Sequence, residues 1–280
     1  MPLPNRPISI GVKSERCTRL MSRSPEVVVH ASPDLLADAV AARLVTKLVD
    51  AQSARGWASV VLTGGGIGIG VLDALRKSPA RDAVQWDRVD VWWGDERFVS
   101  GDDPQRNERQ ARDALLDHVP VAPQRVHHMP ADEGRFAGEP EDAADWYADQ
   151  LAAVARPEDH GSVPRFDVCL LGIGEDGHVA SIFPGAPAAY ESRSVAAVHG
   201  APKPPPVRIT LTFPAIASAA EVWLIAAGLG KAAAVGLAVS GAGPVQIPAA
   251  GAVGRVRTLL LLDKAAAGGL PSTLLRLPLA

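Results

Sequence analysis

The sequence predicts an α/β protein, a single three-layer α/β/α sandwich around a mainly parallel, twisted sheet. Short apolar runs alternate with helical patterns along the chain, an order that is typical of parallel sheets with helices on both faces. Some runs, such as residues 168–171, are apolar at every position, as expected for strands covered on both sides. No repeat or low-complexity linker divides the chain. We therefore expect one domain over residues 24–280, behind a flexible tail at residues 1–23.

The first half of the chain predicts three units, each a strand followed by a helix. Strands are expected at 26–31, 57–62 and 89–93, and helices over 32–52, around Val71 and Leu75, and over 106–116. Ser32 is expected to cap the first helix, because a serine hydroxyl accepts a hydrogen bond from the first turn. A charged loop is expected at residues 94–97, directly after the third strand.

The second half continues the alternation. A loop is expected at 130–138, a helix over 141–154, and strands at 168–171, 208–212, 222–227 and 258–262. Residues 228–231, Gly-Leu-Gly-Lys, are expected to open a further helix. Open α/β sheets bind their ligands at the carboxyl ends of the strands, so polar residues just after strands are the candidates for a site.

Composition excludes several classes of protein. Hydrophobic residues make up 47% of the 280 residues and the formal net charge is -3, so the chain lacks the basic field that nucleic-acid binding usually requires. No apolar run reaches the length of a membrane span, and the N-terminal residues lack the apolar core of a signal peptide. Two cysteines, Cys17 and Cys169, cannot build a disulfide framework. We expect a cytoplasmic protein with no nucleic-acid or membrane partner.

Residues 172–177 have glycines spaced as in the dinucleotide-binding fingerprint, Gly-x-Gly-x-x-Gly. That fingerprint offers bare amide groups and a helix N-terminus to a pyrophosphate. Here Glu175 and Asp176 would meet the pyrophosphate with like charge, and Pro184 cuts the following helix to about two turns. We interpret the turn as one that displays a carboxylate and an imidazole rather than one that binds a nucleotide.

His178 ends this turn and is the candidate general base, since imidazole titrates near neutral pH. Asp176 could orient or tune it, or could merely shape the turn, and a purely structural histidine is the alternative. His127 and His128 form a pair without a carboxylate cluster at ligand spacing, so no metal site is expected.

A second glycine turn follows the strand at 57–62. Its residues, Thr63, Gly64, Gly65 and Gly66, are typical of an anion cradle, because glycine lets the backbone and the next helix N-terminus approach a ligand closely. A tight structural turn is the alternative. Lys231 and Arg208 could add cations. A solvated surface lysine is the commoner interpretation of Lys231 taken by itself, and an ion pair with a carboxylate is the alternative for Arg208.

The charged residues after the strand at 89–93 are also candidates for substrate binding. Asp95, Glu96 and Arg97 follow its carboxyl end, and Asn107 could donate from the next helix. A salt-bridged loop and an ordinary helix-capping asparagine are the alternatives.

Together these residues resemble the 6-phosphogluconolactonase family, within the wider glucosamine-6-phosphate isomerase/deaminase superfamily. The resemblance extends over about residues 26–265. Its five blocks are residues 63–66, residues 92–97 with Asn107 downstream, and residues 171–185, 203–210 and 230–232. Each block is weak alone, but five in this order are specific. The usual family turn reads Ser-Gly-Gly-Ser, so a hydroxyl is missing at Gly66.

The resemblance implies hydrolysis of 6-phospho-D-glucono-1,5-lactone to 6-phosphogluconate in the oxidative pentose phosphate pathway, without a metal or organic cofactor. It implies that His178 activates water. It also implies that the phosphate is held by the glycine turn with Thr63, by Arg208 and by Lys231. Ester hydrolysis passes through an oxyanion, for which Arg97 is our candidate donor.

Two alternatives share this fold. A glucosamine-6-phosphate deaminase usually continues its Gly-His turn as Ile-Ala-Phe-Asn-Glu-Pro, whereas this chain has Phe183 in place of that glutamate. A non-catalytic sugar-phosphate sensor would need a DNA-binding module, and residues 1–25 hold no helix-turn-helix pattern. Both features favour the lactonase.

Overall fold

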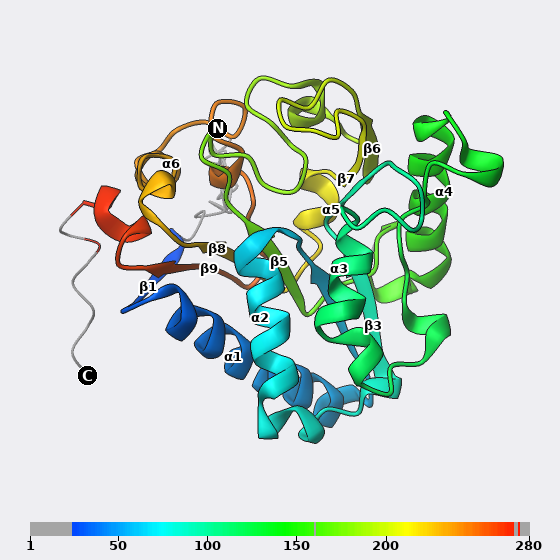
Figure 1. Ribbon diagram of the computed structural model, residues 1–280, viewed down its shortest axis with the longest axis horizontal. Helices are drawn as coiled ribbons and strands as arrows, with labels where there is room; N and C mark the ends of the chain where they lie inside the picture. The colour runs from blue at the N-terminus through cyan, green and yellow to red at the C-terminus, as the bar shows by residue number, and fades with distance from the viewer. Residues whose placement is uncertain (1–23, 160, 272–273, 275–280) are drawn as a thin grey trace, which may run out of the picture.

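The centre of this computed structural model is a six-stranded sheet in which every strand runs parallel to its neighbours (Figure 1). The structure describes residues 24–159, 161–271 and 274, so the predicted tail at 1–23 lies outside the described residues. In spatial order the strands are β1 (Glu26–His30), β9 (Arg257–Asp263), β8 (Glu221–Ala226), β5 (Val168–Gly172), β2 (Ala58–Leu62) and β3 (Val89–Trp93). The mainly parallel sheet predicted from the sequence is confirmed.

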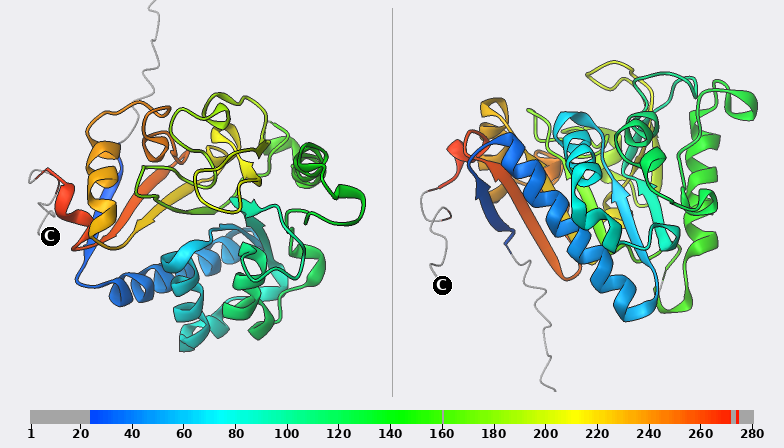
Figure 2. Two further views of the ribbon diagram at one scale, coloured as in Figure 1. Left: turned by 45° about the horizontal axis from the view of Figure 1, so that its top comes forward. Right: turned by 60° about the horizontal axis from the view of Figure 1, so that its bottom comes forward.

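Helices cover both faces of this sheet. One face carries α1 (Pro33–Arg55), α2 (Gly65–Lys77) and α3 (Asn107–Ala114), and the other carries α4 (Pro140–Val154), α5 (Phe213–Ile216) and α6 (Ala232–Val239). Figure 2 shows α1, in blue, packed along its face of the sheet. The three-layer α/β/α sandwich is therefore confirmed.

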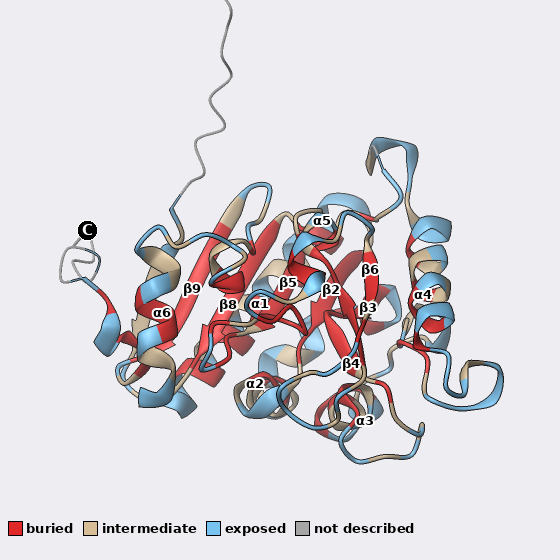
Figure 3. Cartoon of the chain, turned by 90° about the horizontal axis from the view of Figure 1, so that it is seen from above, coloured by how far each residue is buried: buried red, intermediate tan, exposed pale blue. Residues whose placement is uncertain are grey.

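Two hydrophobic cores follow from these layers, because successive strand residues point to opposite faces. In β5, Leu170 packs into the core under α1, α2 and α3, whereas Leu171 packs into the core under α4 and α6. Figure 3 shows the strands buried and the outer sides of the helices exposed. The expected cap of α1 is present, as the Ser32 hydroxyl accepts a hydrogen bond from the Leu35 amide at 3.3 Å.

A second, three-stranded sheet corrects one prediction. Residues 94–97 were expected to form a loop, but Asp95–Arg97 form strand β4, which pairs antiparallel with β7 (Arg208–Leu211). Strand β6 (Val195–Val198), which the sequence did not predict, completes the sheet on the other side of β7. The charged residues of β4 do not show the pattern of a strand. The strand forms because it pairs with β7, which lies more than a hundred residues later in the chain.

The turn after β5 corrects another prediction. No residue between 173 and 186 is helical, although a helix of about two turns was expected there. The chain instead folds back on itself: the Gly174 amide donates to the carbonyl of His178 at 2.8 Å, and Gly177 adopts φ +87°. Positive φ favours glycine, so Gly177 permits the tight return that brings His178 over the strand end.

No helix among the described residues has both the length and the apolar character that a membrane crossing requires.

Candidate active site

A cleft of about 440 Å³ lies where the carboxyl ends of β8, β5, β2 and β3 meet. It is lined by ten of the twelve residues that the sequence singled out: Thr63, Gly64, Gly65, Gly66, Asp95, Arg97, Asn107, His178, Arg208 and Lys231. The other two, Glu96 and Asp176, do not line it. Parallel pairing of β8, β5, β2 and β3, together with the antiparallel pairing of β4 and β7, thus gathers residues that are up to 168 positions apart, from Thr63 to Lys231.

The glycine turn after β2 forms one wall of the cleft. Helix α2 begins at Gly65 with Gly64 as its N-cap, and no side-chain hydrogen bond caps it. Its first amide groups are therefore available to a ligand, and the helix dipole favours a negative one. A Cβ atom on Gly64 would lie 1.9 Å from Oδ1 of Asn107, so the close approach of α3 requires glycine at this position.

His178 and Asp176 form a pair at the turn after β5. Nδ1 of His178 lies 2.5 Å from Oδ1 of Asp176, which also accepts the His178 amide at 3.2 Å. Burial raises the pKa of the Asp176 carboxyl, but the charge and hydrogen bonds of His178 outweigh burial and lower the pKa overall. Asp176 thus orients the imidazole from behind, and within the part of the chain that the structure describes no hydrogen bond to Nε2 of His178 is present.

Two neighbours fit closely around this pair. The ring of Phe183 lies 4.6 Å from the imidazole of His178, tilted by 46°, and both side chains line the cleft. A Cβ atom on Gly174 would lie 2.0 Å from Nδ1 of His178 and 2.5 Å from Oδ1 of Asp176. The position of the pair therefore depends on a glycine at residue 174.

Strand β4 and helix α3 present the remaining polar groups. Asp95 accepts a hydrogen bond from the Ser181 hydroxyl at 2.6 Å and a longer one from the Asn107 amide group at 3.3 Å. The Arg97 guanidinium donates from Nη1 to Oδ1 of Asn107 and to the carbonyl of Gln105, both at 2.6 Å. Asp95 and Arg97 are therefore held in place where they face the cleft.

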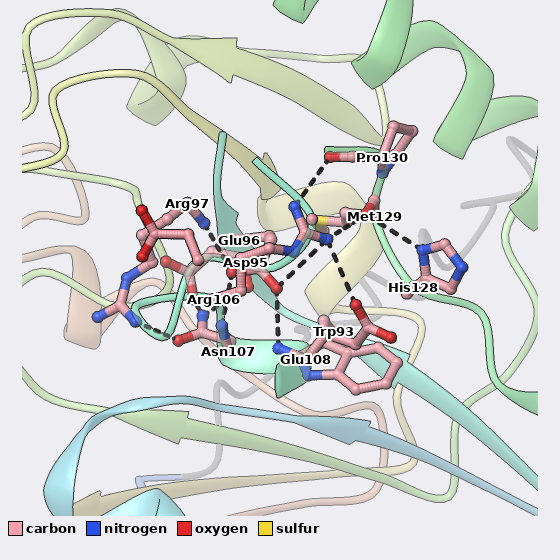
Figure 4. A network of polar contacts seen from close by, with 12 residues as sticks. Trp93, Asp95, Glu96, Arg97, Arg106, Asn107, Glu108, His128, Met129 and Pro130 are labelled. Carbon is pink, nitrogen blue, oxygen red and sulfur yellow. Dashed lines mark hydrogen bonds and ion pairs between the residues drawn. The ribbon is translucent and has the colours of Figure 1, made fainter. Parts of the chain in front are cut away.

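Glu96 corrects the sequence prediction, because it does not reach the cleft. Its side chain is 1% exposed and accepts hydrogen bonds from the amides of Arg97, Asn107 and Glu108 (Figure 4). Burial raises the pKa of Glu96 to about 7, although Arg106 and the three amides act in the opposite direction. Alternation along β4 explains the error, since Asp95 and Arg97 point one way and Glu96 the other.

Three cations besides Arg97 line the cleft: Arg208, Lys231 and Lys203. Lys203 was not among the residues predicted from the sequence to form the site. The guanidinium of Arg208 donates to the carbonyls of Pro205 at 3.0 Å and Lys203 at 2.8 Å, so it holds the proline-rich loop that carries Lys203. Burial lowers the pKa of the Lys231 ammonium, Glu175 acts against this, and the charge of Lys203 adds to it. The positive charge of Lys203 therefore also lowers the pKa of Lys231.

The alternative interpretation of Arg208 also holds in part, because its Nη1 lies 3.9 Å from Oδ2 of Asp95. Burial lowers the pKa of Arg208 while Asp95 raises it. Among the described residues, no group of three or more histidine, cysteine, aspartate or glutamate side chains is arranged to hold a metal ion. His127 instead stacks on Trp92, with ring centroids 3.8 Å apart.

An α/β sandwich with an open helix N-terminus, an oriented histidine and several cations at one sheet edge has the features expected of an enzyme that binds an anionic substrate. The chain belongs to the family described as glucosamine-6-phosphate isomerases/6-phosphogluconolactonase, whose model matches residues 31–260. The family recognised from the five sequence blocks is thereby confirmed.

Its relatives point to one branch of that family. The 6-phosphogluconolactonase of Streptomyces coelicolor is 59% identical over 91% of this chain and 98% of its own length. That of Mycobacterium tuberculosis is 50% identical over 89% of this chain and all of its own. The prediction of an enzyme of the 6-phosphogluconolactonase type is confirmed.

Solved structures agree on the fold. The 6-phosphogluconolactonase of Trypanosoma brucei superposes with a TM-score of 0.74 at 28% identity and covers 88% of this chain and 99% of its own. A monomeric glucosamine-6-phosphate deaminase superposes with a TM-score of 0.70 at 21% identity, over 87% of this chain and 99% of its own, which shows only that the fold is shared.

Proposed function

We propose that this protein hydrolyses 6-phospho-D-glucono-1,5-lactone to 6-phospho-D-gluconate, the second step of the oxidative pentose phosphate pathway, with His178 as the general base. The observation that carries the proposal is the pairing of His178 with Asp176 at the wall of a cleft that is also lined by four cations, Arg97, Lys203, Arg208 and Lys231. We propose a cytoplasmic location, which fits the lack of a disulfide framework in a chain with two cysteines.

The geometry supports a base at Nε2. The carboxylate of Asp176 accepts the proton on Nδ1, which fixes the tautomer and leaves the lone pair of Nε2 free. Nε2 takes a proton from water as the water oxygen attacks the lactone carbonyl carbon. The tetrahedral intermediate then breaks its bond to the ring oxygen, and His178 returns the proton to that oxygen. One water is consumed, and the products are a carboxylic acid and an alcohol.

Arg97 is proposed as the donor to the oxyanion. Its guanidinium lines the cleft and is anchored by Asn107 and the Gln105 carbonyl, so it does not have to reorganise when charge develops. A preorganised donor of this kind contributes about 10²–10³ in rate. Lactones are reactive esters, so one base and one such donor in good alignment are sufficient chemistry.

The phosphate is proposed to bind to the glycine turn and the cations. The open N-terminus of α2 supplies amide donors at Gly65 and Gly66, and Lys231 and Lys203 supply positive charge for a dianion. The hydroxyl missing at Gly66 is offset by these backbone donors. Thr63 adds a hydroxyl, which accepts a hydrogen bond from the Gly172 amide at 3.3 Å and can donate its own proton into the cleft.

The deaminase alternative finds less support. Phe183 occupies the position of the glutamate found in deaminases, packs against His178 and cannot transfer a proton. A non-catalytic sugar-phosphate sensor would not require an imidazole that is hydrogen-bonded to a carboxylate.

The test follows loss of freshly prepared 6-phosphogluconolactone, against its spontaneous hydrolysis, with wild type and His178→Ala. Wild type is expected to accelerate hydrolysis, and the variant to lose most of the acceleration while it still binds 6-phosphogluconate. A wild type no faster than buffer would end the lactonase proposal, and a fully active variant would remove His178 from the base role.

A further inference from the structure

Glu96 is a buried carboxyl that the mechanism above does not use. It lies in β4 between Asp95 and Arg97, which both line the cleft, but its own side chain points into the interior beside α3. A carboxylate without solvent is costly unless donors satisfy it. The hydrogen-bond donors around the Glu96 carboxylate indicate its structural role.

The carboxylate joins β4 to the first turn of α3. Oε1 accepts the amide of Arg97 at 2.8 Å and the amide of Asn107 at 2.7 Å, and Oε2 accepts the amide of Glu108 at 2.8 Å. Two of these donors are the first two amides of a helix, where a negative charge is favoured. Glu96 therefore fixes where α3 begins relative to β4.

The helix start carries Asn107, which holds the arginine of the cleft. Oδ1 of Asn107 accepts from Nη1 of Arg97 at 2.6 Å, and Nδ2 donates to the carbonyl of Asp95 at 2.8 Å. Glu96 thus acts on Arg97 in two ways. It accepts the backbone amide of Arg97 directly, and it positions Asn107, which accepts a hydrogen bond from the Arg97 guanidinium. Both effects depend on the same carboxylate.

Arg106 balances the charge of Glu96. Its side chain is 1% exposed, with Nη2 at 3.8 Å from Oε2 of Glu96 and 3.6 Å from Oε2 of Glu108. It also donates to the carbonyl of Met129 at 2.7 Å, which anchors the cluster to the loop before α4 (Figure 4). The cluster is thus rigid on the side away from the cleft.

We propose that Glu96 is a positioning residue for lactone hydrolysis, which holds the start of α3 against β4 so that Asn107 keeps the Arg97 guanidinium at the cleft. The proposal rests on the proposed lactonase function. It predicts that loss of Glu96 acts on the transition state through Arg97.

The test begins with Glu96→Gln, which keeps the shape but replaces one acceptor oxygen with an NH₂ group that faces an amide donor. The kcat of this variant is expected to fall about tenfold, which is less than the roughly 10²–10³ lost when an oxyanion donor is removed, because Arg97 is displaced but still present. KM for the lactone is expected to change less than twofold. Glu221→Gln is the matched control. Glu221 is also a buried carboxyl with two donors, Lys47 at 2.8 Å and Trp223 at 2.8 Å. It lies at the amino end of β8, away from the cleft, so the kcat of Glu221→Gln is expected to stay within twofold of wild type.

A double-mutant cycle with Arg97→Ala separates positioning from general damage. If Glu96 acts through Arg97, Glu96→Gln is expected to lower kcat about tenfold in wild type and to have no further effect in the Arg97→Ala background. Equal losses in both backgrounds would overturn the inference. If Glu96→Gln does not fold, Glu96→Asp takes its place in the cycle, since its shorter carboxylate withdraws from the amides. An inactive wild type would overturn the lactonase proposal as well, whereas an active wild type with additive losses overturns the positioning role alone.

Discussion

Replacing Gly174 with alanine should displace His178 and Asp176, the proposed catalytic pair, although the substitution itself changes no charged residue. The backbone at Gly174 does not have a positive φ, so alanine brings no backbone strain and its effect is purely steric. The new Cβ atom would lie 2.0 Å from Nδ1 and 2.2 Å from Cε1 of His178, and 2.5 Å from Oδ1 of Asp176. All three distances are far below any real carbon contact.

The size of the effect follows from these distances. Ordinary contact for a Cβ atom begins at 3.4 Å, so the imidazole of His178 has to retreat by about 1.4 Å. A displacement of about 1 Å of a catalytic group costs roughly 10² in rate. We expect kcat to fall by about 10² in Gly174→Ala, which corresponds to about 2.7 kcal/mol in the activation free energy.

The assay compares kcat for lactone hydrolysis and Tm of Gly174→Ala with those of Gly70→Ala. Gly70 lies within α2, and a Cβ atom there would meet nothing within 4 Å, so this control is expected to keep full activity and to gain about 0.5–1 kcal/mol of stability. A folded Gly174→Ala variant with wild-type kcat would refute the steric argument and, with it, the dependence of activity on the position of His178.

Three further outcomes are expected. Lys203→Ala and Lys231→Ala should each raise KM for the phosphorylated lactone about tenfold and leave the rate with unphosphorylated glucono-1,5-lactone unchanged, because each removes a charge-assisted contact to phosphate; a loss confined to kcat would contradict this. Ionised Asp176, whose pKa is lowered in the fold, contributes stability above its ordinary pKa of 3.8 that is lost as pH falls through the folded pKa. The Tm difference between wild type and Asp176→Asn should therefore narrow on acidification below pH 4, and a constant difference would argue against the ion pair. Tyr147→Phe should lower the free energy of unfolding by about 1–3 kcal/mol without loss of activity, because the Trp93 amide, which donates to the tyrosine hydroxyl at 3.1 Å, is left unpaired; chemical denaturation measures the change, and an unchanged value would mean that the hydrogen bond is replaced.

Strands and helices with strong local signals could be predicted from the sequence. The apolar run at β5 and the serine cap of α1 depend on neighbours along the chain, and both are where they were expected. Strand β4 could not be found in this way. Its residues are charged, and what makes it a strand is pairing with β7, which the chain supplies after residue 207.

The members of the site could be predicted in type but not in role. His178 was found because a histidine at the end of a glycine turn after a buried strand is informative by itself. Glu96 was assigned to the cleft with Asp95, because the sequence does not show that β4 alternates and sends neighbouring carboxylates to opposite sides. Lys203 was overlooked as a cleft residue, because its position depends on the hold of Arg208 on the proline-rich loop.

The sequence by itself determined the layered α/β architecture, the family and the two glycine turns, because these depend on periodicity and on residue types close together in the chain. Tertiary structure alone decided that Asp176 lies behind His178 rather than in the cleft, and that Glu96 supports Arg97 instead of meeting substrate. The physical reason is that a side chain's role depends on its direction and its partners, and partners here are joined by strand pairing across most of the chain.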